Sequence, residues 1–165
     1  MEGATDVIGG RLQLAGYQSP GTNTPSWQNV EGLIETLAIL KDVENLELGD
    51  GVRGLEILAD PMLPVVFNNL LEDSVRYASD RTSVKISAAK RGEELLLMYE
   101  DDGPGIPSEK KDSIFDHNYG PSHGIGLHLC RDILLESNIS IVEVGTPEKG
   151  VRFEMLVPAG QFRTA

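Results

Sequence analysis

The sequence predicts an α/β fold, a two-layer sandwich in which helices cover one face of a mixed, mainly antiparallel sheet. Apolar residues recur at helical spacing in separate segments of the chain, and segments of strand-like alternation lie between them. Most of the strand candidates come in consecutive pairs joined by short turns. Such pairs favour antiparallel neighbours and do not fit a regular strand–helix–strand alternation.

The composition bounds the size and the partners of the domain. Its 165 residues suit one domain with a core of its own. A formal net charge of -12 argues against a nucleic-acid surface, because binding to phosphate backbones requires a basic stripe. A protein this acidic that binds a polyphosphate must use a metal ion, helix N-termini and a few placed cations.

The cysteine content and the apolar runs of the sequence bear on the cellular location. The single cysteine, Cys130, cannot form an internal disulfide and fits a reducing cytoplasm, and we expect it to be a small core residue. Residues 1–10 do not have the pattern of a signal peptide, and no apolar run reaches the length of a membrane span. We therefore expect a cytoplasmic fragment without direct membrane contact.

Residues 1–25 are predicted to be an N-terminal extension, and residues 26–165 the main domain. The apolar positions in the first part of the extension are spaced like a fragment of amphipathic helix, which Gly9 and Gly10 weaken. Residues 19–25 are loop by composition.

The first half of the main domain contains two predicted helices and a strand. Ser26 is expected to cap a helix whose apolar face runs to Leu37, and residues 55–59 alternate as a strand should. Pro61 stands at the start of the second helix, where proline is tolerated, and an apolar stripe continues through Val75.

The second half contains paired strands around a long loop and a helix. We predict a helix over residues 124–137. Residues 101–123, rich in Gly, Pro, Asp, Ser and His, form too long a segment for a mere connector, so we expect a functional lid within it. The strands are predicted over residues 83–89, 94–100, 140–144 and 151–157.

A row of polar residues lies on the helix that follows Pro61. Asn69, Asp73 and Arg76 are spaced so that their side chains share one face of this helix. Carboxylate and amide oxygens suit a hard divalent cation, and a guanidinium suits phosphate oxygens. The row is a candidate magnesium-phosphate site, and an ordinary solvated helix face is the alternative.

A second candidate site directly follows a predicted strand, in Asp101-Asp102-Gly103-Pro104-Gly105-Ile106. Glycines here let the backbone pass close to a flat ligand while the Asp101 carboxylate accepts a hydrogen bond. An adenine amine is one suitable donor, and a tight acidic turn is the alternative.

A third candidate opens the predicted helix at Gly124-Ile125-Gly126-Leu127. Glycines at a helix N-terminus expose N–H groups at the positive end of the helix dipole, where phosphate binds. The segment is not a Walker-type loop, because no Gly-Lys-Ser/Thr follows, and no strand leads straight into it as in a dinucleotide-binding motif.

In this order the motifs resemble the ATP-binding superfamily of gyrase, heat-shock chaperone ATPases, histidine kinases and MutL, and in particular the catalytic domain of sensor histidine kinases. The resemblance covers roughly residues 50–158 and implies the Bergerat-type ATP-binding fold. Residues 115–120 and the run from Trp27 are similar to archaeal sensor kinases. The matching motifs are the N box at residues 69–77, the G1 box at 101–106, the F box at 114–116, the G2 box at 124–127 and the closing strand at 150–153.

The resemblance implies ATP and Mg²⁺ as cofactors, with a role for each matching residue. Asp101 would accept the adenine amine, with Gly103 and Gly105 giving it room, and Asp73 would be a metal ligand with Asn69 beside it. No residue is assigned a catalytic role beyond positioning ATP. The remaining implied contacts are Arg76 with a phosphate, Tyr77 with the base or ribose, Ile106 in the G1 box, and Gly124, Ile125, Gly126 and Leu127 with phosphates at the base of a lid over residues 108–123.

Three positions depart from the family pattern. Asp73 replaces the usual asparagine and adds negative charge beside a triphosphate, and Ser122 replaces the first glycine of the G2 box. Val151 and Arg152 stand where a threonine is common, so a hydroxyl near the adenine is missing from the closing strand.

The resemblance favours phosphoryl transfer over hydrolysis. Gyrase-like members carry a glutamate four residues before the metal ligand of the N box, and Asn69 at that position offers no carboxylate to activate water. The three histidines lack the helical context of a phosphoacceptor, so we expect lid or helix-surface positions for His117, His123 and His128. The expected activity is that of a protein-histidine kinase domain whose acceptor histidine lies elsewhere.

The expected partners are the kinase's own dimerisation and phosphoacceptor domain, absent here, and a downstream response regulator. Residues 4–18 are then the tail of the last helix of that domain, and the fragment itself is a monomer or a weak dimer. Two alternatives remain. One is a degenerate nucleotide-binding regulatory domain without kinase turnover, and the other is an anti-sigma-factor-type serine kinase of the same fold.

Overall fold

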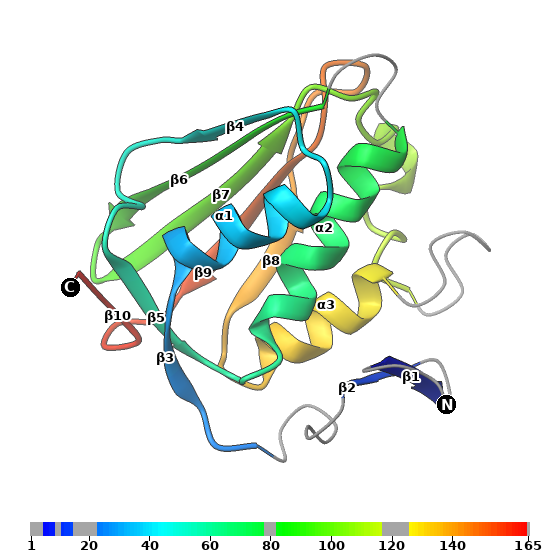
Figure 1. Cartoon of the computed structure of the whole chain (residues 1–165). Coiled ribbons are helices and arrows are strands. Elements are labelled where there is room, and N and C mark those ends of the chain that lie inside the picture. Colours follow the sequence, from blue (N-terminus) through cyan, green and yellow to red (C-terminus); the bar gives the residue numbers. More distant parts are fainter. Residues whose placement is uncertain (1–4, 9–10, 15–22, 78–81, 117–125, 165) are drawn as a thin grey trace.

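The computed structural model describes residues 5–8, 11–14, 23–77, 82–116 and 126–164. Its main sheet has five strands in the order β4-β6-β7-β9-β8 (Figure 1). Neighbouring strands are antiparallel except β4 and β6, which run parallel. The strands are β4 (Asn45–Leu48), β6 (Ser83–Arg91), β7 (Glu94–Asp101), β8 (Ser140–Glu143) and β9 (Arg152–Val157).

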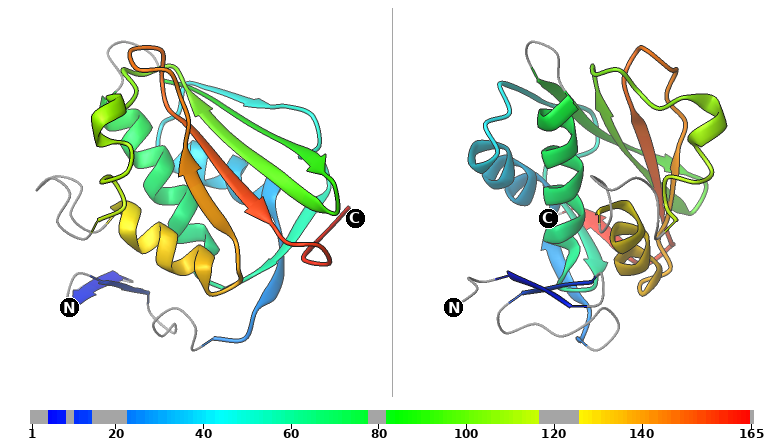
Figure 2. Two further views of the ribbon diagram at one scale, coloured as in Figure 1. Left: turned by 180° about the vertical axis from the view of Figure 1, so that it is seen from behind. Right: turned by 90° about the vertical axis from the view of Figure 1, so that its right-hand side faces the viewer.

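Three helices, α1 (Val30–Leu40), α2 (Leu63–Tyr77) and α3 (Gly126–Leu135), lie on one face of this sheet (Figure 2). The predicted fold class, a two-layer α/β sandwich with a mainly antiparallel sheet, is therefore confirmed. Among the residues that the structure describes, no helix combines the length and the apolar character needed to cross a membrane.

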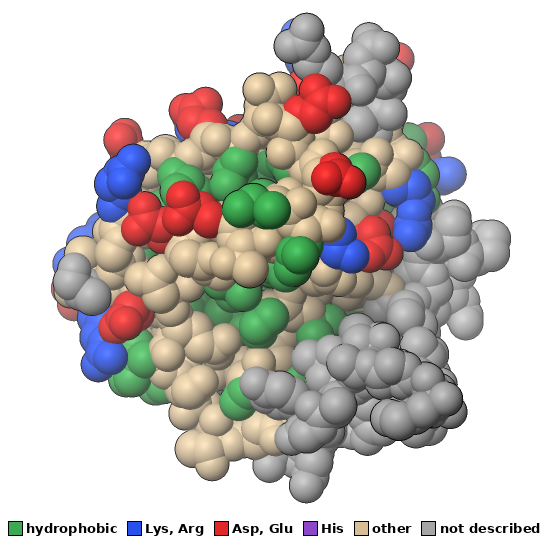
Figure 3. All heavy atoms as spheres, in the orientation of Figure 1, with side chains coloured by type: hydrophobic (Ala, Val, Ile, Leu, Met, Phe, Trp, Pro, Cys, Tyr) green, Lys and Arg blue, Asp and Glu red, His purple; other side chains and the backbone are tan. Residues whose placement is uncertain are grey.

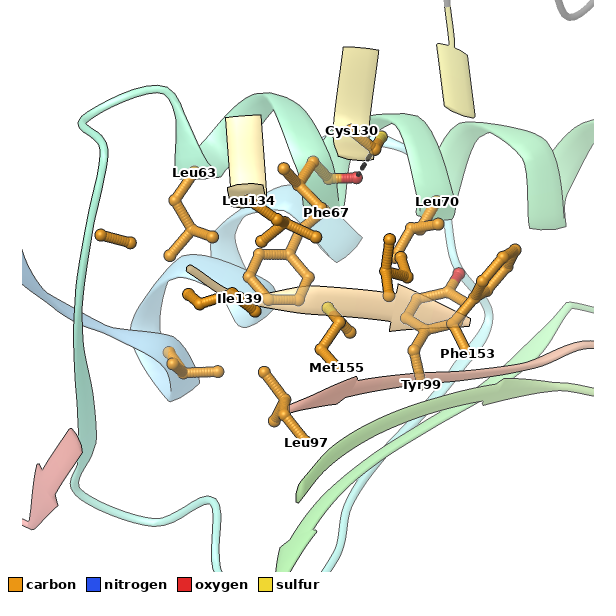
Figure 4. Close-up of a cluster of buried hydrophobic side chains, with 14 of the residues drawn as sticks. Leu63, Phe67, Leu70, Leu97, Tyr99, Cys130, Leu134, Ile139, Phe153 and Met155 are labelled. Atoms are coloured by element: carbon orange, nitrogen blue, oxygen red, sulfur yellow. Dashed lines mark hydrogen bonds between the residues drawn. The ribbon is translucent and has the colours of Figure 1, made fainter. Parts of the chain in front are cut away.

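The hydrophobic core fills the space between the helices and the sheet. Every second residue of β7 points inward, so Leu95, Leu97 and Tyr99 are buried. Phe67 and Leu70 of α2 pack above them (Figure 4). Burying a side chain of this size stabilises the fold by roughly 1.5–3 kcal/mol. This packing fixes α2 over β7, and both elements carry polar residues at one end.

A smaller sheet of three antiparallel strands, in the order β10-β5-β3, was predicted only in part. The prediction that Ser26 caps a helix is wrong, because Ser26 begins β3. The cap of α1 is Asn29, whose Oδ1 accepts the Gly32 N–H at 2.7 Å. The strands are β3 (Ser26–Asn29), β5 (Leu55–Ala59) and β10 (Phe162–Thr164).

The ends of α2 and α3 differ from the predicted ones. Asp60 caps the turn before α2, since its Oδ1 accepts the Met62 N–H at 2.8 Å and its carbonyl accepts the Leu63 N–H at 2.9 Å. Pro61 therefore lies in this turn, and the helix begins at Leu63. In its described part, α3 ends at Leu135 and not at residue 137.

The N-terminal extension contains an antiparallel strand pair, β1 (Thr5–Ile8) and β2 (Arg11–Leu14). The helix expected over residues 4–18 is therefore wrong for these residues. The Gly9-Gly10 pair between the two strands is a dipeptide typical of hairpin turns, which explains why the strand pairing prevails over the weak helical spacing. The domain boundary after residue 25 stays a prediction.

Gly51 and Gly92 both adopt a left-handed backbone conformation next to β6, but they differ in how close other atoms lie. Gly51 has a φ of +81°, and a Cβ there would collide with the Ala88 carbonyl. Gly92 has a φ of +65°, and no atom of the described part of the chain lies within 4 Å of a Cβ built there. We expect Gly92→Ala to lower the free energy of unfolding by about 1 kcal/mol, the effect of the left-handed conformation alone. Gly51→Ala should lower it clearly more, because the backbone must also move away from β6. Chemical denaturation measures both, and equal losses would contradict a steric role for Ala88.

Candidate functional site

One pocket of about 200 Å³ lies among the end of α2, the loop after β7, the first turn of α3 and the start of β9. The residues expected at the site that line it are Asp73, Tyr77, Asp101, Gly103, Gly105, Ile106 and Leu127. The lining residues that were not assigned to the site from the sequence are Leu70, Ser74, Pro104, Pro107, Val151 and Phe153. A mostly apolar pocket with a few converging polar groups is the usual form of a small-molecule site.

Asp101 is held by three donors. Its Oδ1 accepts the backbone N–H groups of Gly103 and Val151, both at 3.0 Å, and its Oδ2 accepts the Ser74 hydroxyl at 2.5 Å. A carboxylate has about four acceptor positions. One position therefore remains, on Oδ2, for a donor of a bound ligand.

Ser74 and Tyr99 form a chain of hydroxyl groups behind Asp101, and neither residue was predicted at the site. The Tyr99 phenol oxygen lies 2.6 Å from Ser74 Oγ, and both side chains are buried. Burial raises the pKa of the Tyr99 phenol well above its ordinary value, so the phenol stays protonated. The alternation of β7 places Tyr99 and Asp101 on one face of the strand. What the sequence does not show is that α2 brings Ser74 over that face.

The loop after β7 is closed by the turn between β8 and β9. Gly105 has a φ of +74°, and a Cβ there would lie 2.9 Å from the Gly150 carbonyl oxygen and 3.2 Å from that of Thr146. The Glu148 N–H donates to the Pro104 carbonyl at 2.7 Å. The close approach that glycine permits at position 105 is therefore to this turn, in addition to any room it leaves for a ligand.

The carboxylate of Asp73 has a distant ion-pair partner. Its Oδ1 lies 3.8 Å from Arg76, whereas Arg76 lies 3.2 Å from Glu72. Burial raises the pKa of Asp73 from 3.8 to about 6, with the charges of Glu72 and Asp101 raising it and that of Arg76 lowering it. A carboxylate short of both solvent and countercharge is well suited to bind a hard cation.

Asp73 and Asn69 are the metal ligands that the sequence predicts. Within the described ranges, no three His, Cys, Asp or Glu side chains form a cluster that could hold a metal ion. Asn69, the second expected metal ligand, does not line the pocket, and its Nδ2 lies 3.7 Å from Cys130 Sγ. The amide oxygen of Asn69 is then the atom left for a metal ion.

Cys130 is buried, as expected, and connects α3 to α2. Its Sγ donates to the Val66 carbonyl at 3.8 Å (Figure 4), in addition to its contact with Asn69. Burial raises the pKa of the Cys130 thiol to about 12. The thiol is thus an uncharged packing group between the two helices.

The first turn of α3 reaches the pocket through Leu127. Gly126 begins the helix, and no atom of the described residues lies within 4 Å of a Cβ built there. The surface position expected for His128 is wrong, because this side chain is buried with 4% exposure. The reason is that α3 also buries Leu129 and Cys130, so it is covered on more than one side. Residues 117–125 lie outside the described ranges, and the predicted positions among them are His117, Ser122, His123, Gly124 and Ile125.

The segment that the sequence predicts as the first half of a lid is fixed to the sheet. Lys111 Nζ donates to the Glu143 carboxylate and, at 2.8 Å, to the Gly145 carbonyl. The Glu143 side chain is fully buried, and its second oxygen accepts the N–H groups of Gly145 and Arg152 at 3.0 and 2.9 Å. These contacts tie the segment around Lys111 to the sheet, because a buried charge needs such partners. The lid over residues 108–123 stays a prediction.

The F box supports the same arrangement. Phe115 is buried and packs edge-on against Phe153 of β9, with 6.4 Å between ring centroids. The Arg131 guanidinium of α3 lies over the Phe115 ring at 5.7 Å. Phe115 thus joins the segment before α3 to both the sheet and the helix.

Asp73→Asn tests how much the ionised Asp73 carboxylate destabilises the protein when no metal ion is bound. A shift of the Asp73 pKa from 3.8 to about 6 corresponds to about 3 kcal/mol of lost stability when the carboxylate is ionised. Because the folded state binds this proton more tightly than the unfolded state, the loss is absent below about pH 4, grows as the pH rises, and is complete above about pH 6. We expect Asn to raise the free energy of unfolding by up to about 3 kcal/mol at about pH 7.5 and by much less at about pH 4.5.

Urea denaturation of the metal-free protein at the two pH values measures this difference. An equal gain at both values would show that the effect of the substitution is not electrostatic.

The comparisons with known proteins agree with this geometry. Residues 60–161, more than half of the chain, match the family described as histidine kinase-, DNA gyrase B-, and HSP90-like ATPase. The sensor protein KdpD of Escherichia coli K12 is 30% identical over 93% of this chain and 19% of its own length. The chain spans about a fifth of the length of the curated relatives it matches.

Solved structures share the fold. The catalytic domain of the histidine kinase ThkA has a TM-score of 0.69 at 23% identity and covers 81% of this chain and 95% of that one. Full-length ShkA in complex with AMPPNP has a TM-score of 0.71 at 20% identity and covers 87% of this chain and 32% of that one. With residues of its N, G1 and G2 boxes lining one pocket, the chain belongs to the family of histidine kinase-, DNA gyrase B-, and HSP90-like ATPases, and the relatives named here are sensor proteins and histidine kinases.

Proposed function

We propose that this domain binds Mg-ATP and donates the γ-phosphoryl group to a histidine on a separate dimerisation domain, as part of a two-component sensor kinase. The observation that carries the proposal is the Asp101 carboxylate, which three donors hold in the wall of an apolar pocket with one acceptor position left. The AMPPNP complex of ShkA, a structure of the same fold, supports a nucleotide as the ligand.

The direction of hydrogen bonding selects the base. An ionised Asp101 can only accept, and adenine presents an exocyclic amine at the position where guanine presents a carbonyl oxygen. Guanine would therefore place one acceptor against another. Ile106, Leu127 and Phe153 of the pocket wall offer apolar surface to a flat ring. Tyr77, 39% exposed, suits the more polar edge of the base or the ribose.

The phosphates and the metal ion belong at the other side of the pocket. Asp73 and Asn69 are the proposed protein ligands of Mg²⁺, and Arg76 the proposed cation for a phosphate. The N–H groups at the start of α3, from Gly126 onward, add partial positive charge. When bound, Mg²⁺ would offset the phosphate charge, which the formal net charge of -12 of this chain cannot do.

Phosphoryl transfer to an external acceptor fits better than hydrolysis. Position 69 holds an amide and not a carboxylate, so this helix offers no general base for water there. His128, the histidine within the described residues, is buried and thus not presented to a phosphoryl group. The acceptor is therefore assigned to the dimerisation domain, and a response regulator to the step after it.

A second function, nucleotide-dependent regulation without turnover, is favoured by one observation. The Asp73 carboxylate lies in the field of Asp101 and Glu72, both of which raise its pKa, and this concentrates negative charge where a triphosphate must bind. Such a site holds a nucleotide only with a cation and turns over slowly if the cation is bound too tightly.

Asp101→Asn tests the base contact. The amide oxygen would keep the two backbone N–H groups, so its NH₂ group would face the adenine amine, donor against donor. We expect the affinity for ATP to fall by about 100-fold in calorimetric titration. The matched control is Asp102→Asn, since Asp102 accepts the Ser83 N–H at 3.1 Å outside the pocket lining. Unchanged ATP affinity in a folded Asp101→Asn variant would refute the adenine assignment.

Titration of ATP with and without Mg²⁺ tests the metal assignment. We expect Mg²⁺ to strengthen ATP binding by about tenfold or more, Asp73→Ala to remove most of this gain, and Mg²⁺ alone to show no binding. An identical ATP affinity in both buffers would contradict the assignment of Asp73 and Asn69 as Mg²⁺ ligands. Strong Mg-dependent binding without phosphorylation of an added dimerisation domain would favour the regulatory function.

A further inference from the structure

We infer that Ser74 is a positioning residue for the carboxylate of Asp101, and that Tyr99 fixes the direction of the Ser74 hydroxyl. The inference rests on the proposed function, because the adenine contact is assigned to Asp101. It makes selectivity for the base depend on a hydroxyl of α2 that does not itself recognise the base.

The direction of each hydrogen bond in this chain follows from proton count. Ser74 Oγ has one proton, and the carboxylate Oδ2 at 2.5 Å can only accept it. The Tyr99 phenol, 2.6 Å from Ser74 Oγ, must therefore donate to Ser74. With Tyr99 at 0% and Ser74 at 5% exposure, water cannot easily replace either partner. The hydroxyl of Ser74 has one orientation as long as Tyr99 stands behind it.

This orientation decides which acceptor position Asp101 offers to a ligand. Oδ1 is saturated by the N–H groups of Gly103 and Val151. Oδ2 keeps one position open because Ser74 occupies the other. Without that hydroxyl, Oδ2 would present two positions, and water or a differently placed donor could use either. Ser74 therefore restricts the carboxylate to a single donor in one place.

Of the three hydrogen-bond donors to Asp101, Ser74 is the one that a side-chain substitution can remove. The other two donors to Asp101 are backbone N–H groups, which every residue except proline retains. The side chain at 151, where a hydroxyl could have served, is valine. The chain thus supplies its side-chain donor from α2 instead of from β9.

The test uses three variants, because Ser74→Ala alone mixes two effects. Ser74→Ala removes the donor to Asp101 and also leaves the buried Tyr99 phenol without its partner, which lowers stability. Tyr99→Phe keeps the Ser74 donor and removes the phenol. In Ser74→Ala/Tyr99→Phe no phenol is left unpaired, so its stability should return toward that of the unaltered domain while the donor stays absent.

Thermal unfolding and titration with ATP and GTP, both with Mg²⁺, give the readouts. For Ser74→Ala we expect a lower Tm and about tenfold weaker ATP binding. For the double variant we expect a largely restored Tm, the same tenfold loss of ATP affinity, and a smaller preference for ATP over GTP. The ATP affinity of Tyr99→Phe should fall by about threefold, because the Ser74 hydroxyl is then free to turn.

A double variant with both Tm and ATP affinity of the unaltered domain would overturn the inference, since Ser74 would then serve stability alone. Asp101→Asn, measured alongside, separates this failure from a failure of the proposed function. Loss of ATP binding in Asp101→Asn together with full affinity in the double variant removes only the role of Ser74. Full affinity in Asp101→Asn removes the adenine contact itself, and the role of Ser74 with it.

Discussion

The site depends on one carboxylate that is bonded to three elements at once. Asp101, at the end of β7, accepts from its own loop, from Val151 before β9 and from Ser74 on α2. Removing a carboxylate from water is unfavourable unless donors replace the water, so the loop, strand and helix are drawn to this group. The backbone follows the same constraint at Gly150, where a Cβ would collide with the Asp101 carbonyl. The polar end of the pocket is thus organised around a charge and not around a ligand.

The apolar core determines which residues of α2 can serve that charge. Phe67 and Leu70 fix the helix over β7, and the rotation of the helix then directs Ser74 toward the sheet and leaves Asp73 closer to solvent. The consequences differ sharply for two adjacent residues. Ser74 becomes a buried donor, while Asp73, with 27% of its side chain exposed, remains a carboxylate with a raised pKa of about 6 at the pocket wall. Packing of hydrocarbon side chains thus separates Ser74, the residue proposed to position Asp101, from Asp73, the proposed metal ligand.

The features that could be predicted from the sequence are those that depend on local residue patterns. The paired strands β6 and β7, and β8 and β9, follow from alternation and short turns, and these pairs suffice for the fold class. Asp101 follows from its position after a strand, and its glycines from the tight path of the loop. Short strands such as β10 are not predictable in the same way, because Phe162 pairs with Ile57, a partner far away in the sequence.

The polar contacts that the sequence could not predict are all tertiary. Ser74 and Tyr99 look like ordinary helix and strand residues, and nothing around Glu143 indicates that its carboxylate is fully buried against Lys111. The space-filling view shows acidic and basic side chains interspersed on the face that it presents (Figure 3). Charged residues are thus common on that face whether or not they belong to a site. Burial separates functional charges from solvated ones, and burial is a property of the fold.

The single cysteine of the chain makes the contact between α2 and α3 chemically observable. The Cys130 thiol is buried, has a pKa of about 12 and bonds to the carbonyl of Val66 across the helix interface. A thiol in that state is nearly inert toward alkylating reagents, because the thiolate is the reactive form. Its rate of alkylation therefore reports how often α2 and α3 separate, without any introduced label, and the rate can be compared with and without added nucleotide.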